Sequence, residues 1–179
     1  TWVEDEVFRV FILSDYTTTE IANGVRVALF RQGLRPVVQE GVIGVIDQEI
    51  LNTKGNLAQF KPSLVVIFPS AERIIAALVG VTTKEEMTSI LDQFESYWTN
   101  LWSSLQNKLE PTIWHHAYVP PEGYTDFASE TIDPIWELNK RLSLLSLTSF
   151  EWLSLDNLIS QIGYDQWVDP RFLNHGDFP

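Results

Sequence analysis

Hydrophobic and polar positions fall into two kinds of segment along this chain. Short apolar runs rich in β-branched and aromatic residues are typical of buried strands. Longer segments with apolar residues at i, i+3, i+4 and i+7 indicate amphipathic helices. The pattern predicts strands at residues 7–13, 35–41, 63–68, 111–119 and 151–156. It predicts helical segments at residues 17–33, 47–51, 56–60, 83–108, 129–148 and 157–162.

The alternation of strands and helices determines the expected fold class. Strands separated by helices are joined by right-handed crossovers, which produce a parallel sheet. The run at 63–68 is apolar throughout, as expected of a central strand covered on both faces. Pro36 near the start of the second run suits an edge strand. We therefore expect an α/β fold, a three-layer α/β/α sandwich whose five parallel strands have the flavodoxin-like order 2-1-3-4-5.

Cap residues predict the ends of the first helix. Thr17, Thr18 or Thr19 can accept hydrogen bonds from the first N–H groups of that helix. Thr17 and Glu20 have the spacing of a capping box. Gly33 is expected to end the helix in the left-handed conformation.

Length and composition indicate one globular domain. The 179 residues are 45% apolar and 20% charged, so residues 1–179 are expected to form a single α/β domain. The first residue is Thr1 rather than Met, and we expect a piece of a longer chain. The absence of Cys excludes disulfide and thiolate chemistry and fits a reducing, cytoplasmic setting. No apolar run approaches about 18 residues, so no membrane span is expected.

Charge restricts the partners. The chain has 24 acidic and 12 basic residues, a net charge of −12. Binding to nucleic-acid phosphates needs clustered Lys and Arg, so this charge argues against nucleic acid. It also argues against anionic membrane surfaces, and against highly anionic substrates unless a basic pocket is present locally.

A cluster of small polar residues follows the first strand. In open parallel sheets, ligands bind at the carboxyl ends of the strands, so the turn at 14–18 is the first place to expect a site. A hydroxyl in this turn could act as a nucleophile, with nearby backbone N–H groups as an oxyanion hole. The alternative is that these residues only form a turn and a helix cap. The Pro69-Ser70 turn after the third strand is a second candidate site loop.

Two further groups complete the candidate cleft. His115 and His116 end the fourth strand, and because neighbouring strand residues point to opposite faces, at most one is expected in the cleft. The end of the chain holds Asp165, Asp169, Arg171 and His175, where an Asp and a His could complete a Ser-His-Asp set; the favoured alternative is an Asp–Arg pair that fastens the tail to the domain. The candidate catalytic set is Ser14, Asp15, Tyr16, His115, His116 and Asp169.

Motifs for cofactors are missing from the chain. No GxGxxG follows the first strand and no GxxxxGK[ST] occurs, which argues against a dinucleotide or a Walker-type phosphate site. The paired His residues have no second His or Cys cluster with which to bind zinc. We therefore expect no cofactor or metal in this domain.

Several short sequence segments resemble the N-terminal domain of FkbH-like proteins. Their order and spacing match across nearly the whole chain. They lie at residues 12–18, 47–51, 57–67, 137–142, 155–158, 162–163 and 167–172. The resemblance implies an SGNH-hydrolase-like domain, followed in the family by a HAD-type phosphatase-like domain that uses Mg. That domain carries an Asp-x-Asp-x-Thr motif, which does not occur here. The resemblance therefore covers the N-terminal half only, and Mg belongs to the absent HAD domain.

The catalytic motifs of SGNH hydrolases are altered at the matching positions. Ser-Asp-Tyr stands where Gly-Asp-Ser is expected, which puts Tyr16 at the position of the nucleophile. The Asn expected after the fourth strand is replaced at His115 or His116. The terminal Asp-x-x-His keeps Asp169 but has Phe172 in place of His. The resemblance therefore implies a fold that is kept and a triad that is lost.

The family takes a glyceryl unit from a bisphosphoglycerate and loads it as a thioester onto an acyl carrier protein in polyketide biosynthesis. We expect a non-hydrolytic domain that assists this loading of a glyceryl or other acyl unit. Carrier proteins are acidic, so contact requires a local basic patch, with Arg9, Arg26, Arg31 and Arg35 as candidates. The alternatives are an active esterase or acyltransferase that uses Ser14, and a structural interaction domain of a megasynthase.

Overall fold

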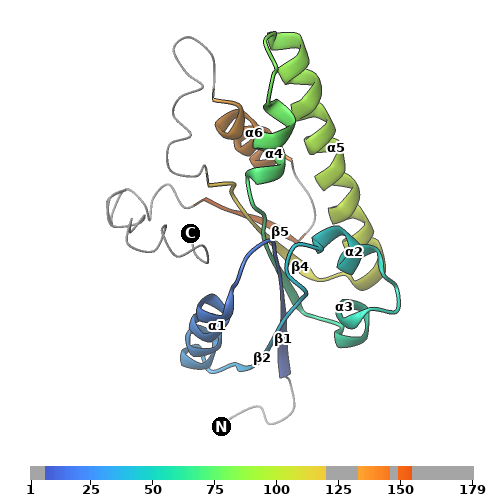
Figure 1. Cartoon of the computed structure of the whole chain (residues 1–179). Helices are drawn as coiled ribbons and strands as arrows, with labels where there is room; N and C mark the ends of the chain where they lie inside the picture. Colours follow the sequence, from blue (N-terminus) through green and yellow to red (C-terminus); the bar gives the residue numbers. More distant parts are fainter. Residues whose placement is uncertain (1–6, 120–132, 146–148, 155–179) are drawn as a thin grey trace.

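The computed structural model of the protein describes residues 7–119, 133–145 and 149–154 (Figure 1). Five strands form one parallel sheet in the order β2-β1-β3-β4-β5, so the predicted fold class and strand order are confirmed. The strands are β1 (Val7–Ser14), β2 (Arg35–Glu40), β3 (Leu64–Phe68), β4 (Thr112–His116) and β5 (Phe150–Leu153). The helix predicted at 157–162 lies outside the described residues.

Helices cover both faces of the sheet, as the three-layer prediction requires (Figure 1). The helices are α1 (Thr19–Arg31), α2 (Ile46–Leu51), α3 (Asn56–Phe60), α4 (Glu72–Leu78), α5 (Lys84–Leu109) and α6 (Pro134–Ser143). Among the described helices, α1 contributes to the smaller core cluster, and the other five contribute to the larger one on the opposite face. The sequence pattern missed α4, because only Ile74 and Leu78 of its seven residues are buried.

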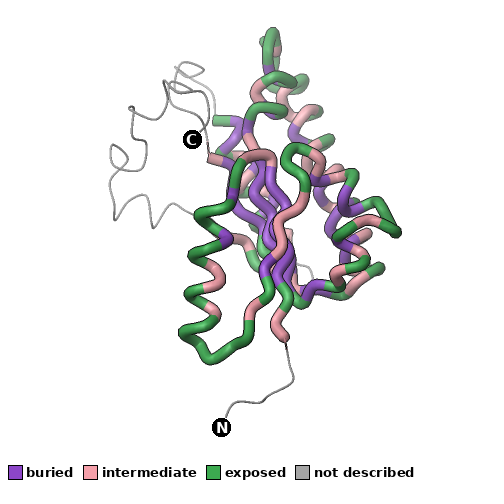
Figure 2. The backbone as a smooth tube through the Cα atoms, turned by 60° about the horizontal axis from the view of Figure 1, so that its bottom comes forward, coloured by how far each residue is buried: buried purple, intermediate pink, exposed green. Residues whose placement is uncertain are grey.

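Alternating side chains of β1 and β3 supply both clusters. Phe11 and Leu13 of β1 and Ile67 of β3 belong to the larger cluster, whereas Ile12 and Val66 belong to the smaller one. Strands covered on both faces have no polar side to present, which explains why β3 is apolar throughout. The burial colours in Figure 2 show this continuous buried centre.

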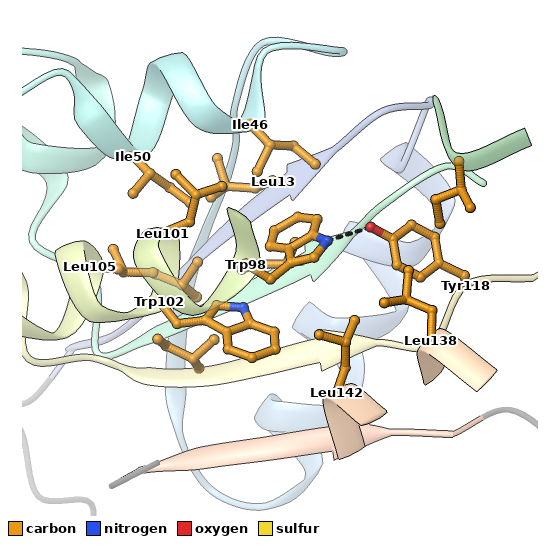
Figure 3. Packing of buried hydrophobic residues seen from close by; sticks show 14 of the residues in the cluster. Leu13, Ile46, Ile50, Trp98, Leu101, Trp102, Leu105, Tyr118, Leu138 and Leu142 are labelled. Atoms are coloured by element: carbon orange, nitrogen blue, oxygen red, sulfur yellow. Dashed lines mark hydrogen bonds between the residues drawn. The ribbon is translucent and has the colours of Figure 1, made fainter. Parts of the chain in front are cut away.

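The long helix α5 covers the larger face. Its buried residues recur at spacings of three, four and seven, and they are Leu91, Trp98, Leu101, Trp102 and Leu105. Both Trp side chains are therefore part of the core (Figure 3). Thr83 caps the helix: its hydroxyl accepts from Glu86 N, and the Glu86 carboxylate accepts from Thr83 N. Glu110, with φ 52°, ends the helix in the left-handed region just before β4.

The start of α1 differs from the prediction. Thr18 occupies the N-cap position and makes no side-chain cap, so the predicted box of Thr17 and Glu20 is wrong. The hydroxyl of Thr18 instead donates to Glu40 Oε2 at 2.8 Å, because the end of β2 lies beside the start of α1. Gly33 follows the helix with φ +80°, as predicted. In the part of the chain that is described, no helix is long and apolar enough to cross a membrane.

Candidate functional site

The turns that follow β1 and β3 are joined at the carboxyl edge of the sheet. Asp15 N donates to Phe68 O at 3.1 Å, and Ser70 N donates to Asp15 Oδ2 at 2.9 Å. The two candidate loops of the sequence analysis therefore form one structure, fixed through the backbone and side chain of Asp15. Parallel strands end at the same edge, and this is the usual place for a ligand site in such folds.

A small hollow opens beside this junction, on the face covered by α5. Its volume is about 10 Å³, which is room for about one water molecule. The lining combines one carboxylate, one guanidinium and two phenols with apolar side chains. The lining residues are Asp15, Ile46, Ser70, Arg73, Phe94, Tyr97, Trp98 and Tyr118.

The surroundings of Asp15 have opposing effects on the pKa of its carboxyl group. Burial raises the pKa of Asp15, while the hydrogen bond from Ser70 N and the charge of Arg73 act to lower it. Asp47 and Glu72 also raise this pKa by repulsion. The net result is a raised pKa for the Asp15 carboxyl, which the hydrogen bond from Ser70 N and the charge of Arg73 only partly offset.

Tyr97 holds Arg73 in place. Arg73 Nη1 donates to Tyr97 Oη at 3.2 Å, and the guanidinium carbon lies 5.3 Å from the centre of the Tyr97 ring. Burial raises the pKa of Tyr97. A cation held against a ring in this way is available to a carbonyl or an anionic group of a ligand.

Tyr118 forms the buried wall of the hollow. Its hydroxyl accepts a hydrogen bond from Trp98 Nε1, the dashed line in Figure 3. Its backbone N–H donates to Asn139 Oδ1 at 2.8 Å and its carbonyl accepts from Asn139 Nδ2 at 2.9 Å. Burial raises the pKa of Tyr118 far above its ordinary value, so this phenol stays protonated.

Ser14 lies on the other face of the sheet. It is buried and follows the alternation of Val10 and Ile12, which belong to the cluster beneath α1. Its Oγ accepts a hydrogen bond from Tyr16 N at 3.0 Å, the arrangement of a Ser turn. Burial raises the pKa of Tyr16 to about 12.

The two histidines of β4 point to opposite faces, as the strand alternation predicts. His116 packs against Phe68 with ring centres 5.2 Å apart, on the side of Ser14. Its Nδ1 lies 2.6 Å from Ala117 O, and this contact requires the proton on Nδ1. Burial lowers the pKa of His116. Burial thus favours the neutral imidazole, which is held by the carbonyl of the next residue.

His115 is a core residue. Its ring is stacked on Trp152 at 5.1 Å and meets the edges of Trp98 and Trp102 at 4.4 and 5.2 Å. Burial, with a smaller effect from His116, lowers its pKa to about 3. It has no access to solvent and lies in the aromatic packing between β4, β5 and α5.

The candidate catalytic residues predicted from the sequence therefore lie on different sides of the sheet. Asp15 lines the hollow on the α5 face, Ser14 and Tyr16 lie with His116 on the α1 face, and His115 is in the core. Asp169 lies outside the described residues. Whether any of these residues takes part in catalysis stays a prediction.

Sequence reasoning missed most of the hollow. The turn at Pro69-Ser70 indicated Ser70 as a candidate. Arg73, however, lies on helix α4, which the sequence pattern did not predict, and Tyr97 lies next to the buried apolar stripe of α5. No spacing in the sequence connects these residues to Asp15. Among the described residues, no group of three or more His, Cys, Asp or Glu gathers as metal ligands. The hollow does not fit Mg²⁺, since its one carboxylate faces a guanidinium.

Comparison with known proteins gives a family match and a structural match. Residues 9–119 match the family described as "FkbH, N-terminal domain". A crystal structure of the N-terminal part of the protein BF1531 from Bacteroides fragilis, containing a phosphatase domain and complexed with Mg, superposes with a TM-score of 0.76 at 15% identity. The match covers 99% of this chain and 48% of that one, so this chain spans about half its length. No curated protein matches the sequence.

Proposed function

The chain belongs to the FkbH N-terminal domain family, and from this premise we propose that it is a non-hydrolytic, SGNH-like domain of an FkbH-like protein. In this proposal, residues 1–179 are one domain of a longer chain that loads a glyceryl or other acyl unit onto an acyl carrier protein. The domain assists the loading by holding the unit or its carrier. The observation that carries the proposal is the separation of Ser14, beneath α1, from the polar hollow at Asp15.

The surroundings of Ser14 support the non-hydrolytic part. A serine nucleophile needs a base within about 2.6–3.2 Å. Among the described residues, Ser14 Oγ accepts a hydrogen bond from the backbone N–H of Tyr16, and the His116 ring packs against Phe68 with its Nδ1 on Ala117 O. The Tyr16 phenol, with a pKa of about 12, is protonated at neutral pH and is a weak nucleophile.

The hollow supports a role in holding a polar group. Asp15 can accept a hydrogen bond from a hydroxyl group, and Arg73 can donate one to a carbonyl or carboxylate group. A glyceryl unit carries groups of both kinds. A volume of about 10 Å³ excludes an enclosed acyl chain, so only a small polar end would enter. The rest of the unit would lie outside, where an attached carrier can reach it.

A binding assay with an acyl carrier protein tests the proposal. The carrier is titrated in its apo, phosphopantetheinylated and glyceryl-loaded forms against the wild type. We expect the loaded form to bind best, and Asp15→Asn and Arg73→Gln to reduce this preference. Lys84→Gln is the control, because Lys84 is an exposed cation at the start of α5. Failure of all three forms to bind the wild type would overturn the proposal.

Two competing functions have separate readouts. If the domain is an esterase that uses Ser14, hydrolysis of nitrophenyl acetate should fall in Ser14→Ala; equal background rates in both proteins would end that alternative. If the domain is only a structural part of a megasynthase, Asp15→Asn in the whole FkbH-like protein would leave acyl loading unchanged.

A further inference from the structure

The segment formed by α1 and the start of β2 has an unusual charge for this protein. The chain as a whole has a net charge of −12. Between Glu20 and Glu40 there is no acidic residue, and the segment contains Arg26, Arg31 and Arg35. Of the four arginines considered from the sequence, these three are close along one helix and the adjoining edge strand, whereas Arg9 lies on β1.

The same segment exposes large apolar side chains. Phe30 is 63% exposed and Val27 is 53% exposed, and Leu34 just beyond the helix is also exposed. Val27 and Arg31 are four positions apart on α1, so they lie along one line of the helix, and Leu34 follows three residues after its end. We call Arg26, Val27, Phe30, Arg31, Leu34 and Arg35 the α1–β2 surface. Figure 1 shows α1 set apart from the helices of the opposite face.

Arg26 is held in position by its neighbours. Its Nη1 donates to Asn23 Oδ1 at 2.8 Å and its Nη2 donates to Val38 O at 2.9 Å. Val38 lies on the edge strand β2, so the guanidinium covers one carbonyl of the open edge. The contact fixes a cation beside the apolar line and discourages pairing of another strand at this point.

Charge and apolar exposure together define the partner. An acidic protein is repelled by most of this molecule, so its approach is favoured only where cations gather, within a Debye length of about 8–10 Å. An exposed Phe beside Arg combines two residue types that are enriched in protein interfaces. The line of side chains along α1 suits another helix packed against it.

We propose that the α1–β2 surface docks an acidic partner protein through a helix that presents apolar side chains between carboxylates. The identification of this partner as an acyl carrier protein rests on the proposed function. The assignment of the surface as a docking site rests on its charge and its exposed apolar side chains. Six residues define the surface, against about 20–30 a side in a stable interface, and this fits a transient contact of the kind needed to pass a loaded unit onward.

Matched variants test the surface. Arg31→Glu reverses an exposed charge on α1, and Phe30→Ser removes an exposed ring. Their controls are Lys84→Glu, the same charge change at the start of α5, and Val79→Ser, which removes a side chain that is 72% exposed after α4. The probe is phosphopantetheinylated acyl carrier protein. We expect each α1 variant to bind at least about tenfold more weakly, and both controls to stay within about twofold of the wild type.

The outcomes separate this inference from the proposed function. Equal binding of the carrier by the wild type and by both α1 variants would overturn the inference and leave the function standing. If the carrier does not bind the wild type, the second probe is a synthetic helical peptide with Glu on one face and Leu on the other. Saturable peptide binding that is lost in Arg31→Glu and Phe30→Ser supports the surface, and no saturable binding overturns it. A wild-type dimer that Phe30→Ser dissociates would assign the surface to a second copy and also overturn the inference.

Discussion

The side-chain amide of Asn139 in α6 binds both backbone groups of Tyr118: Oδ1 accepts from Tyr118 N at 2.8 Å, and Nδ2 donates to Tyr118 O at 2.9 Å. Tyr118 lies two residues beyond β4, where the sheet no longer supplies partners on both sides. The amide therefore acts like a short piece of neighbouring strand. Since the Tyr118 ring lines the hollow, Asn139 also fixes one wall of the candidate site.

Asn139→Ala should destabilise the protein by about 1–3 kcal/mol, because it leaves two partly buried backbone groups without partners. Asn139→Asp should also destabilise, since a carboxylate cannot donate to Tyr118 O. The measurement is the free energy of unfolding in urea. Asn107→Ala, at an exposed position of α5, is the control and should change little. A cost for Asn139→Ala no larger than that of the control would contradict the assigned role.

The capping box of α5 gives a second prediction. Thr83→Ala should lower the free energy of unfolding by about 1 kcal/mol, because Glu86 N loses its acceptor at the start of the longest helix. Thr82→Ala is the matched control, since Thr82 uses only its backbone N–H in the contact with Glu86. Equal effects of the two changes would show that the side-chain cap is not responsible.

Acid should destabilise the protein through His115. Its pKa is about 3 in the folded state, whereas an unfolded imidazole has an ordinary pKa of 6.5. Between these values only the unfolded chain takes up the proton, so the free energy of unfolding falls as the pH falls. The loss is about 1.4 kcal/mol per pH unit for this group, or about 2 kcal/mol between pH 6.5 and 5. His116 acts in the same direction, since burial lowers its pKa too.

The measurement for this prediction is urea unfolding at pH 7 and pH 5. His115→Leu should reduce the difference between the two pH values, because the buried ring can no longer be protonated on unfolding. The raised pKa of Asp15 acts in the opposite direction, but Asp15 is present in both proteins and its effect cancels in the comparison. The same pH dependence in both proteins would show that His115 is not the group responsible.

Asp15 should titrate above its ordinary pKa of 3.8, since burial in the hollow disfavours the charged carboxylate. Arg73→Gln should raise this pKa further by removing the nearby cation. The readout is the ¹³C shift of the Asp15 carboxyl group as a function of pH. Lys84→Gln serves as the control for the loss of one positive charge, and it should leave the titration of Asp15 unaltered. An unchanged or lower pKa of Asp15 in Arg73→Gln would show that the guanidinium does not act on this carboxyl.

The sequence by itself determined the sheet and its layers. Apolar runs separated by helices require crossovers, which give a parallel sheet, and the uniform apolarity of 63–68 marks a central strand. The stripe that includes Trp98 and Trp102 correctly predicted the core face of α5. These features depend on the local spacing of apolar and polar residues, which can be read directly from the sequence.

Only the tertiary structure decided the composition of the candidate site. Asp15 meets Ser70 across 55 positions, and Arg73 and Tyr97 join them from two different helices. Ser14 and Asp15 are neighbours in sequence but lie on different sides of the sheet, because Ser14 ends β1 on the side of Val10 and Ile12, whereas Asp15 begins the turn beyond the strand and lines the hollow. Contacts between distant segments depend on how the helices are placed on the sheet, and no spacing along the chain encodes that placement.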